Sequence, residues 1–73
     1  MDNNELKAAL IRQTPVILTH ADGHESEYKR VSAIIYRAVK KHIVVTAELL
    51  DCNGRSVVIC EPEKVREKVV TNV

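Results

Sequence analysis

The chain has 73 residues, of which 45% are hydrophobic, and this composition predicts one small globular domain and excludes a disordered chain. The formal charge of +1 excludes a polycation, so the overall field gives little attraction to nucleic acid. Only 3% of the residues are aromatic, so the core must be aliphatic. A domain of this length buries only about 60% of its unfolded surface, which favours help from an interface with another chain.

The N-terminal sequence MDNNELKAAL is acidic and polar, unlike a signal peptide. No apolar run approaches the roughly 20 residues that a membrane span needs. Two cysteines without an export signal favour a reducing compartment. We therefore expect a cytoplasmic protein with no membrane partner.

Residues 1–13 are predicted to form a short helix. The polar side chains at positions 2–4 can cap its start, and Leu6 and Leu10 recur on one face. Pro15 ends the helix, because the residue before a proline is pushed out of the helical region.

The segment PVILTH, residues 15–20, is a short apolar run with proline at its first position, where a strand tolerates it. Asp22 and Gly23 follow, and this pair favours a tight hairpin turn because glycine accepts a positive φ. We expect residues 27–36 to turn back and pair with PVILTH.

Residues 27–41 fit two structures. Apolar residues recur there at helical spacing: Val31, Ile34, Ile35, Ala38 and Val39. Most of these are β-branched residues that suit strands better than helices. The next segment, HIVVTAELL, alternates clearly as a strand does. We predict a hairpin of two strands, and an α+β fold with residues 27–41 helical stays open as the alternative.

Asn53-Gly54 lies between apolar runs and favours a two-residue type I′ turn. Pairing outward from that turn predicts these partners: Cys52 with Arg55, Leu50 with Val57, Leu49 with Val58, and Ala47 with Cys60. The segment from Pro62 to Val65 is then predicted to form one helical turn before a short last strand, with a short helix to the C-terminus as the alternative.

The predicted order is one helix and then four or five short antiparallel strands, with a helical turn before the last. This order is the plan of a small SH3-like antiparallel barrel, a mainly β fold. We expect residues 14–70 to form that barrel domain and residues 1–13 to pack on it as the N-terminal helix.

The chain resembles small proteins carried by phages and conjugative elements of Gram-positive bacteria. The likeness rests on EYKRVSAIIYR, VTAELLD, NGRSVVI and PEKV, and it covers about two thirds of the chain. It implies an accessory protein of a mobile element and assigns no residue a role.

Catalytic and cofactor signatures are missing from the sequence. The only two glycines, Gly23 and Gly54, are used in turns, so no loop is left to cradle a phosphate. The histidines His20, His24 and His42 lack the spacing of a zinc site. No serine or cysteine has a recognisable base and orienting group. We predict no enzyme, no metal and no cofactor.

One candidate binding site is a basic segment without acidic residues. Its cations could contact phosphates: Lys29, Arg30, Arg37, Lys40 and Lys41. The competing interpretation is a solvated hairpin whose charges prevent edge-to-edge aggregation.

The second candidate is apolar. The predicted register places Leu50, Val57 and Ile59 on the face opposite the predicted core, with Val44 further along. A patch of this kind should not remain in water. We expect the N-terminal helix to cover part of it and a partner or a second copy to take the rest.

These observations predict a non-catalytic protein-interaction module that binds a protein partner or forms a homo-oligomer. The alternative is a nucleic-acid-binding accessory protein that uses residues 29–41.

Overall fold

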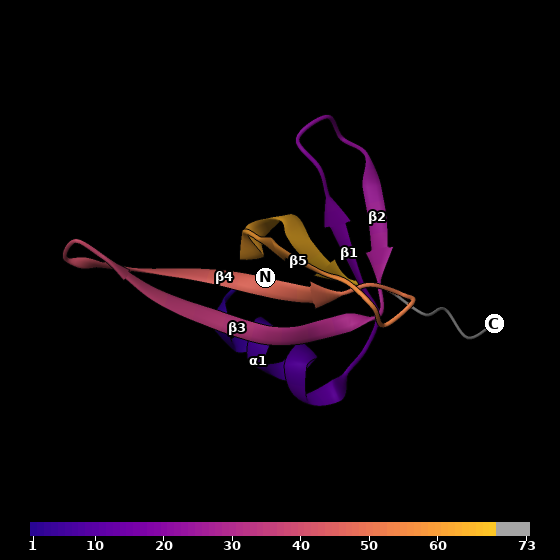
Figure 1. Cartoon of the computed structure of the whole chain (residues 1–73), viewed down its shortest axis with the longest axis horizontal. Coiled ribbons are helices and arrows are strands. Elements are labelled where there is room, and N and C mark those ends of the chain that lie inside the picture. Colours follow the sequence, from indigo (N-terminus) through magenta and orange to yellow (C-terminus); the bar gives the residue numbers. More distant parts are fainter. Residues whose placement is uncertain (69–73) are drawn as a thin grey trace.

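The computed structural model describes residues 1–68 and shows a mainly β domain with a short N-terminal helix (Figure 1). Its elements are α1 (Asn3–Arg12), β1 (Val16–Thr19), β2 (Glu25–Tyr28), β3 (Arg30–Val39), β4 (His42–Leu50), β5 (Val57–Cys60), the 3₁₀ turn η1 (Pro62–Lys64) and β6 (Val65–Glu67). The strands form two three-stranded antiparallel sheets, in the orders β2-β1-β6 and β3-β4-β5. The mainly β prediction is confirmed, but the described strands form two sheets and not a closed barrel.

The predicted helix is present, and its ends are fixed by local hydrogen bonds. The Glu5 N–H donates to the Asp2 carboxylate at 2.8 Å, and the Asp2 N–H donates back to the Glu5 carboxylate at 3.1 Å. This reciprocal pair satisfies two backbone donors that a helix start leaves free. At the other end Gln13 adopts a left-handed φ of 57°, and its N–H donates to the Ala9 carbonyl at 2.9 Å.

The first hairpin pairs β1 with β2, which confirms a hairpin at the Asp22-Gly23 turn. Of the predicted partner segment 27–36, only Glu27 and Tyr28 pair with β1, whereas residues 30–36 belong to β3 and pair with β4. Gly23 has a φ of 88° in the turn, and the His20 N–H donates to the His24 carbonyl at 2.7 Å. The chain then leaves this sheet at Lys29, whose N–H donates to the Leu50 carbonyl of the other sheet at 2.8 Å.

Residues 27–41 form strands, so the helical alternative is wrong. β3 pairs with β4 from Arg30 to Val39, with one bulge at Ser32. The two strands join at Lys40-Lys41, where Lys40 takes a φ of 55° and Val39 pairs with His42. The strand preference of the β-branched residues therefore predicted this segment correctly, whereas the helical spacing of its apolar residues did not.

The β4–β5 register matches the prediction at Leu50 with Val57, Leu49 with Val58 and Ala47 with Cys60, but the turn type was wrong. The predicted pair of Cys52 with Arg55 lies in the loop, outside the ladder. A type I′ turn needs a positive φ at Asn53, and this residue does not have one. The loop instead closes through two bonds of 2.8 Å, from the Gly54 N–H to the Asp51 carbonyl and from the Asp51 N–H to the Ser56 carbonyl. The Asp51 carboxylate also accepts the Cys52 N–H at 2.8 Å, which is typical of aspartate at the start of such a turn.

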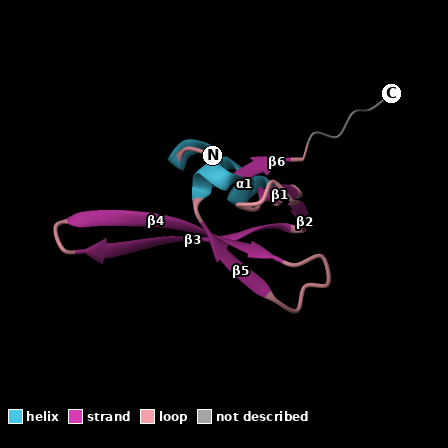
Figure 2. Cartoon of the chain, turned by 90° about the horizontal axis from the view of Figure 1, so that it is seen from above, coloured by secondary structure: helices cyan, strands magenta, loops and turns pink. Residues whose placement is uncertain are grey.

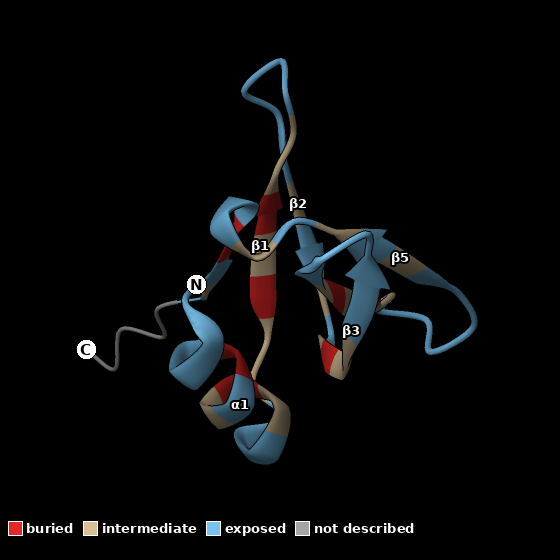
Figure 3. Ribbon diagram, turned by 90° about the vertical axis from the view of Figure 1, so that its left-hand side faces the viewer, coloured by how far each residue is buried: buried red, intermediate tan, exposed pale blue. Residues whose placement is uncertain are grey.

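The core lies between α1, the β2-β1-β6 sheet and one face of the β3-β4-β5 sheet (Figure 3). Its buried members are Leu6, Ala9, Val16, Leu18, Val31, Ala47, Leu49 and Val65. The described part of the chain reaches this core through a helical turn and a short strand, as predicted, because η1 leads into β6 and β6 pairs with β1. The Met1 ammonium fastens this region by donating to the carbonyls of Pro62 at 2.7 Å and Val65 at 3.1 Å. The predicted domain end at residue 70 lies outside the described residues.

The far half of the β3–β4 hairpin projects from this core (Figure 2). Residues 36–44, which we call the arm, are all exposed. The arm gives the molecule a longest dimension of 48 Å and a radius of gyration of 12.5 Å. A compact domain of this length would have a radius of gyration of about 11 Å. Both faces of the arm are therefore exposed to solvent.

Candidate interaction surface

The β3-β4-β5 sheet has one covered face and one open face. Ala47 and Leu49 are fully buried, so their face is the inner one that meets the core. Side chains alternate along a strand, so the residues between them point to the opposite side, which we call the outer face. The strand register places these apolar residues on the outer face: Ile35, Val39, Val44, Leu50, Val57 and Ile59.

The outer face is open in the arm and along β5, whereas Ile35 and Leu50 between them are partly buried. Val39 is 45% exposed, Val44 is 44%, Val57 is 48% and Ile59 is 56%. These values show that nothing in residues 1–68 covers them. Several exposed aliphatic side chains on one face of a sheet are typical of an interaction site.

The prediction that the helix covers part of this patch is wrong. α1 packs on the inner face, where Leu6 and Ala9 enter the core beside Val31. Tyr36, which points to the same side, donates from its hydroxyl to the Asn3 carboxamide oxygen at 2.7 Å. The prediction that Leu50, Val57 and Ile59 share one face is confirmed, but α1 does not cover that face.

The five predicted basic residues do not form one site. Lys29 and Arg30 lie where β3 begins, whereas Arg37, Lys40 and Lys41 lie in the arm. Arg30 and Arg37 are seven residues apart on an extended strand, a separation of about 23 Å. The structure therefore brings together only the three cations of the arm.

Ion pairs are concentrated at the opposite end of the molecule. The pairs among residues 1–68 are Arg12 with Glu67, Lys64 with Glu61, Arg66 with Glu25, and Lys68 with Glu27. None of these pairs involves the arm, whose three cations face solvent without a carboxylate partner in the described chain. Although the net charge is only +1, the arm therefore carries three cations that are unpaired within the described chain, whereas the ion-paired charges lie outside the arm.

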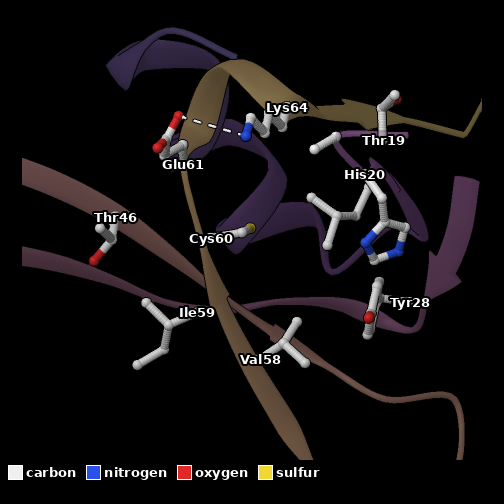
Figure 4. Close-up of a pocket in the computed structure, with 11 residues that line it drawn as sticks. Thr19, His20, Tyr28, Thr46, Val58, Ile59, Cys60, Glu61 and Lys64 are labelled. Carbon is white, nitrogen blue, oxygen red and sulfur yellow. Dashed lines mark ion pairs between the residues drawn. The ribbon is translucent and has the colours of Figure 1, made fainter. Parts of the chain in front are cut away.

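A cleft of about 490 Å³, not predicted from the sequence, opens between the two sheets beside β5 (Figure 4). Leu18, Tyr28, Val58 and Cys60 supply its apolar lining. His20 stands at the rim, with its Nε2 2.8 Å from the Ser26 hydroxyl. No motif indicated this cleft, because it depends on the spacing of two sheets that share no strand.

The cleft holds one thiol, and its surroundings keep that thiol protonated. Burial raises the pKa of Cys60, the neighbouring Glu61 carboxylate raises it further, and Lys64 opposes the shift. A raised pKa lowers the thiolate fraction at neutral pH, and the thiolate is the reactive form. The Cys60 Sγ instead lies 3.7 Å from the Ala47 carbonyl oxygen as a weak hydrogen-bond donor.

Two further observations concern the described part of the chain. No three histidine, cysteine, aspartate or glutamate side chains in residues 1–68 are grouped to hold a metal ion. The same residues contain no helix of the length and apolar character that crossing a bilayer requires.

Comparison with protein-family models, curated proteins and solved structures found no match.

Proposed function

We propose that the chain is a non-catalytic protein-interaction module and that its outer face binds the partner. The observation that carries the proposal is the set of aliphatic side chains, Val39, Val44, Val57 and Ile59, left about half exposed on the side of the sheet opposite the buried Ala47 and Leu49. Fully burying such a side chain contributes roughly 1.5–3 kcal/mol, so covering the exposed half contributes roughly 1 kcal/mol each. A partner that covers the row gains this energy, and the isolated chain does not.

The pattern of polar residues on the same face restricts the partner. Arg37 and His42 lie at the arm end, and Thr46 and Glu48 lie in the middle. We infer that the partner presents an apolar surface with a carboxylate at the position that meets Arg37. An arginine pairs with such a group in a bidentate geometry.

The strand order supports a finer proposal about the fold. The chain passes from β2 to β3 across the single residue Lys29, and a 3₁₀ turn precedes the last strand, β6, which returns to β1. We propose that the two sheets are the halves of an opened SH3-like barrel. The resemblance to proteins of phages and conjugative elements adds the proposal that the module serves a mobile element in the cytoplasm.

Site-specific photo-cross-linking in the organism that encodes the chain tests the function. A photoreactive amino acid at Val44 lies on the outer face, whereas the same group at Lys7 lies on the exposed side of α1 and serves as the matched control. We expect Val44 to give one discrete adduct with a different protein and Lys7 to give none. Equal adducts from both positions, or an adduct with nucleic acid alone, would contradict the proposal.

A second candidate function rests on the arm. Its cations Arg37, Lys40 and Lys41 have no described ion-pair partner, and a two-stranded ribbon fits a DNA major groove of about 12 Å. Three phosphate contacts would make the logarithm of affinity fall with that of salt with a slope of about −2.7. A photoreactive group at Lys41 would then attach to nucleic acid, and its yield would fall steeply as salt rises.

A further inference from the structure

One edge strand of this protein lacks the protection that the others have. Unpaired edges are usually guarded by charges, prolines or bulges, because a bare edge pairs with another chain. β2 carries Glu25 and Glu27, β6 carries Arg66, and β3 has its bulge at Ser32. β5 is the fourth edge in the described residues, and Val57–Cys60 contains neither a charge nor a bulge.

The free backbone groups of β5 are identified by the ladder. The Asp51 N–H donates to the Ser56 carbonyl, so this pair is a hydrogen-bonded one. Hydrogen-bonded and non-hydrogen-bonded pairs alternate along antiparallel strands. The backbone groups of Val58 therefore face β4, whereas the N–H and C=O groups of Val57 and Ile59 point away from the sheet.

The described chain leaves space on both sides of this edge. The cleft of about 490 Å³ opens beside β5, and Val58, Ile59 and Cys60 all help to line it. On the outer side Val57 is 48% exposed and Ile59 is 56% exposed. A strand added here would find apolar contacts for both of its faces.

We propose that β5 pairs with β5 of a second copy, antiparallel about a two-fold axis at Val58. Val57 then lies opposite Ile59 of the second copy, and each of these residues uses its outward backbone groups. About four backbone hydrogen bonds form, because each hydrogen-bonded pair exchanges two. The β3-β4-β5 sheet of one copy and the same sheet of the second copy then form one continuous sheet of six strands.

Charge complementarity selects the second copy and this register. Pairing about Val58 brings Arg55, in the loop before β5, towards Glu61 of the second copy, which directly follows β5, at both ends of the interface. Within one chain these residues are six positions apart, about 20 Å along an extended strand, so they are too distant to pair. Within the described part of its own chain, Glu61 has only the exposed Lys64, at 3.9 Å, as an ion-pair partner. A register centred on Val57 would place Arg55 opposite Ile59, and one centred on Ile59 would place Glu61 opposite Val57.

Charge reversal tests the pairing by sedimentation equilibrium of the full chain at low salt. Arg55→Glu and Glu61→Arg each turn two attractions into two repulsions, and we expect each to weaken dimerisation about tenfold or more. The double variant restores opposite charges and should recover the original association. Lys7→Glu makes the same change of charge as Arg55→Glu but on α1, remote from β5, and should have no effect.

Two results would overturn the inference: a chain that remains monomeric at all concentrations, or a double variant that associates as weakly as the single variants. Arg55 and Glu61 are both exposed, so we expect equal melting temperatures for all four variants. Equal melting temperatures show that a change in association does not result from unfolding. The inference is independent of the proposed function. The cross-linking at Val44 tests binding of a different protein, and its adduct is distinguished from a self-adduct by mass.

Discussion

Removal of residues 1–12 is expected to unfold the domain. The truncation takes Leu6 and Ala9, which are both fully buried, out of the core and exposes Val31 and Leu49 behind them. Loss of one buried leucine side chain alone costs about 2–5 kcal/mol, whereas whole domains are stable by only about 5–15 kcal/mol. Circular dichroism of the shortened chain should show no cooperative thermal transition.

The matched control is Ile11→Ala in the full-length chain. Ile11 belongs to the same helix but is 80% exposed, so its truncation should change the free energy of unfolding by no more than about 0.5 kcal/mol. A shortened chain that melts cooperatively at the full-length temperature would show that α1 does not complete the core.

Leu49→Ala should lower the free energy of unfolding by about 2–5 kcal/mol, because Leu49 is fully buried on the inner face of β4. Leu50→Ala makes the same change one residue later on the outer face. It should cost only about 1 kcal/mol, since Leu50 is partly exposed and its truncation removes less buried apolar surface. Urea titration measures both, and equal losses would contradict the division into inner and outer faces.

Much of the fold follows from local rules. Strand alternation predicted which residues of β4 and β5 face the core, and the position of the turn between Asp51 and Ser56 fixed the register. The register was predicted correctly although the turn type was wrong, because the predicted type I′ turn and the observed loop both leave Leu50 paired with Val57.

The location of the helix could not be predicted in this way. Both faces of the β4–β5 hairpin are apolar, so burial alone gives the helix no preference. The short link after Arg12 keeps α1 close to β1, and Val16 and Leu18 of that strand lie in the core. The helix must therefore share the side of the sheet on which β1 packs, a long-range relation that no local pattern contains.

The basic segment shows how strand geometry divides a group of cations that is continuous in the sequence. On a helix, Arg30 and Arg37 would lie about 10 Å apart on one face, at a rise of about 1.5 Å per residue. On the observed strand their separation is about 23 Å. The predicted site of five cations therefore becomes two smaller groups, and the arm keeps Arg37, Lys40 and Lys41.

The central claim is that the aliphatic side chains of the outer face serve a partner and not the fold of the chain. The free energy of unfolding of the double variant Val44→Thr and Val57→Thr tests it most directly. Threonine keeps the β-branched shape and adds a hydroxyl, so strand propensity is retained while burial in an apolar site is penalised. Val31→Thr makes the same change at a fully buried position and serves as the control.

We predict that the double variant stays within about 0.5 kcal/mol per site of the original chain, because water already reaches both residues. Val31→Thr should lose about 1–3 kcal/mol, because its hydroxyl is buried in an apolar core. If Val44→Thr and Val57→Thr each cost as much as Val31→Thr, the outer face stabilises the chain itself and is not reserved for a partner.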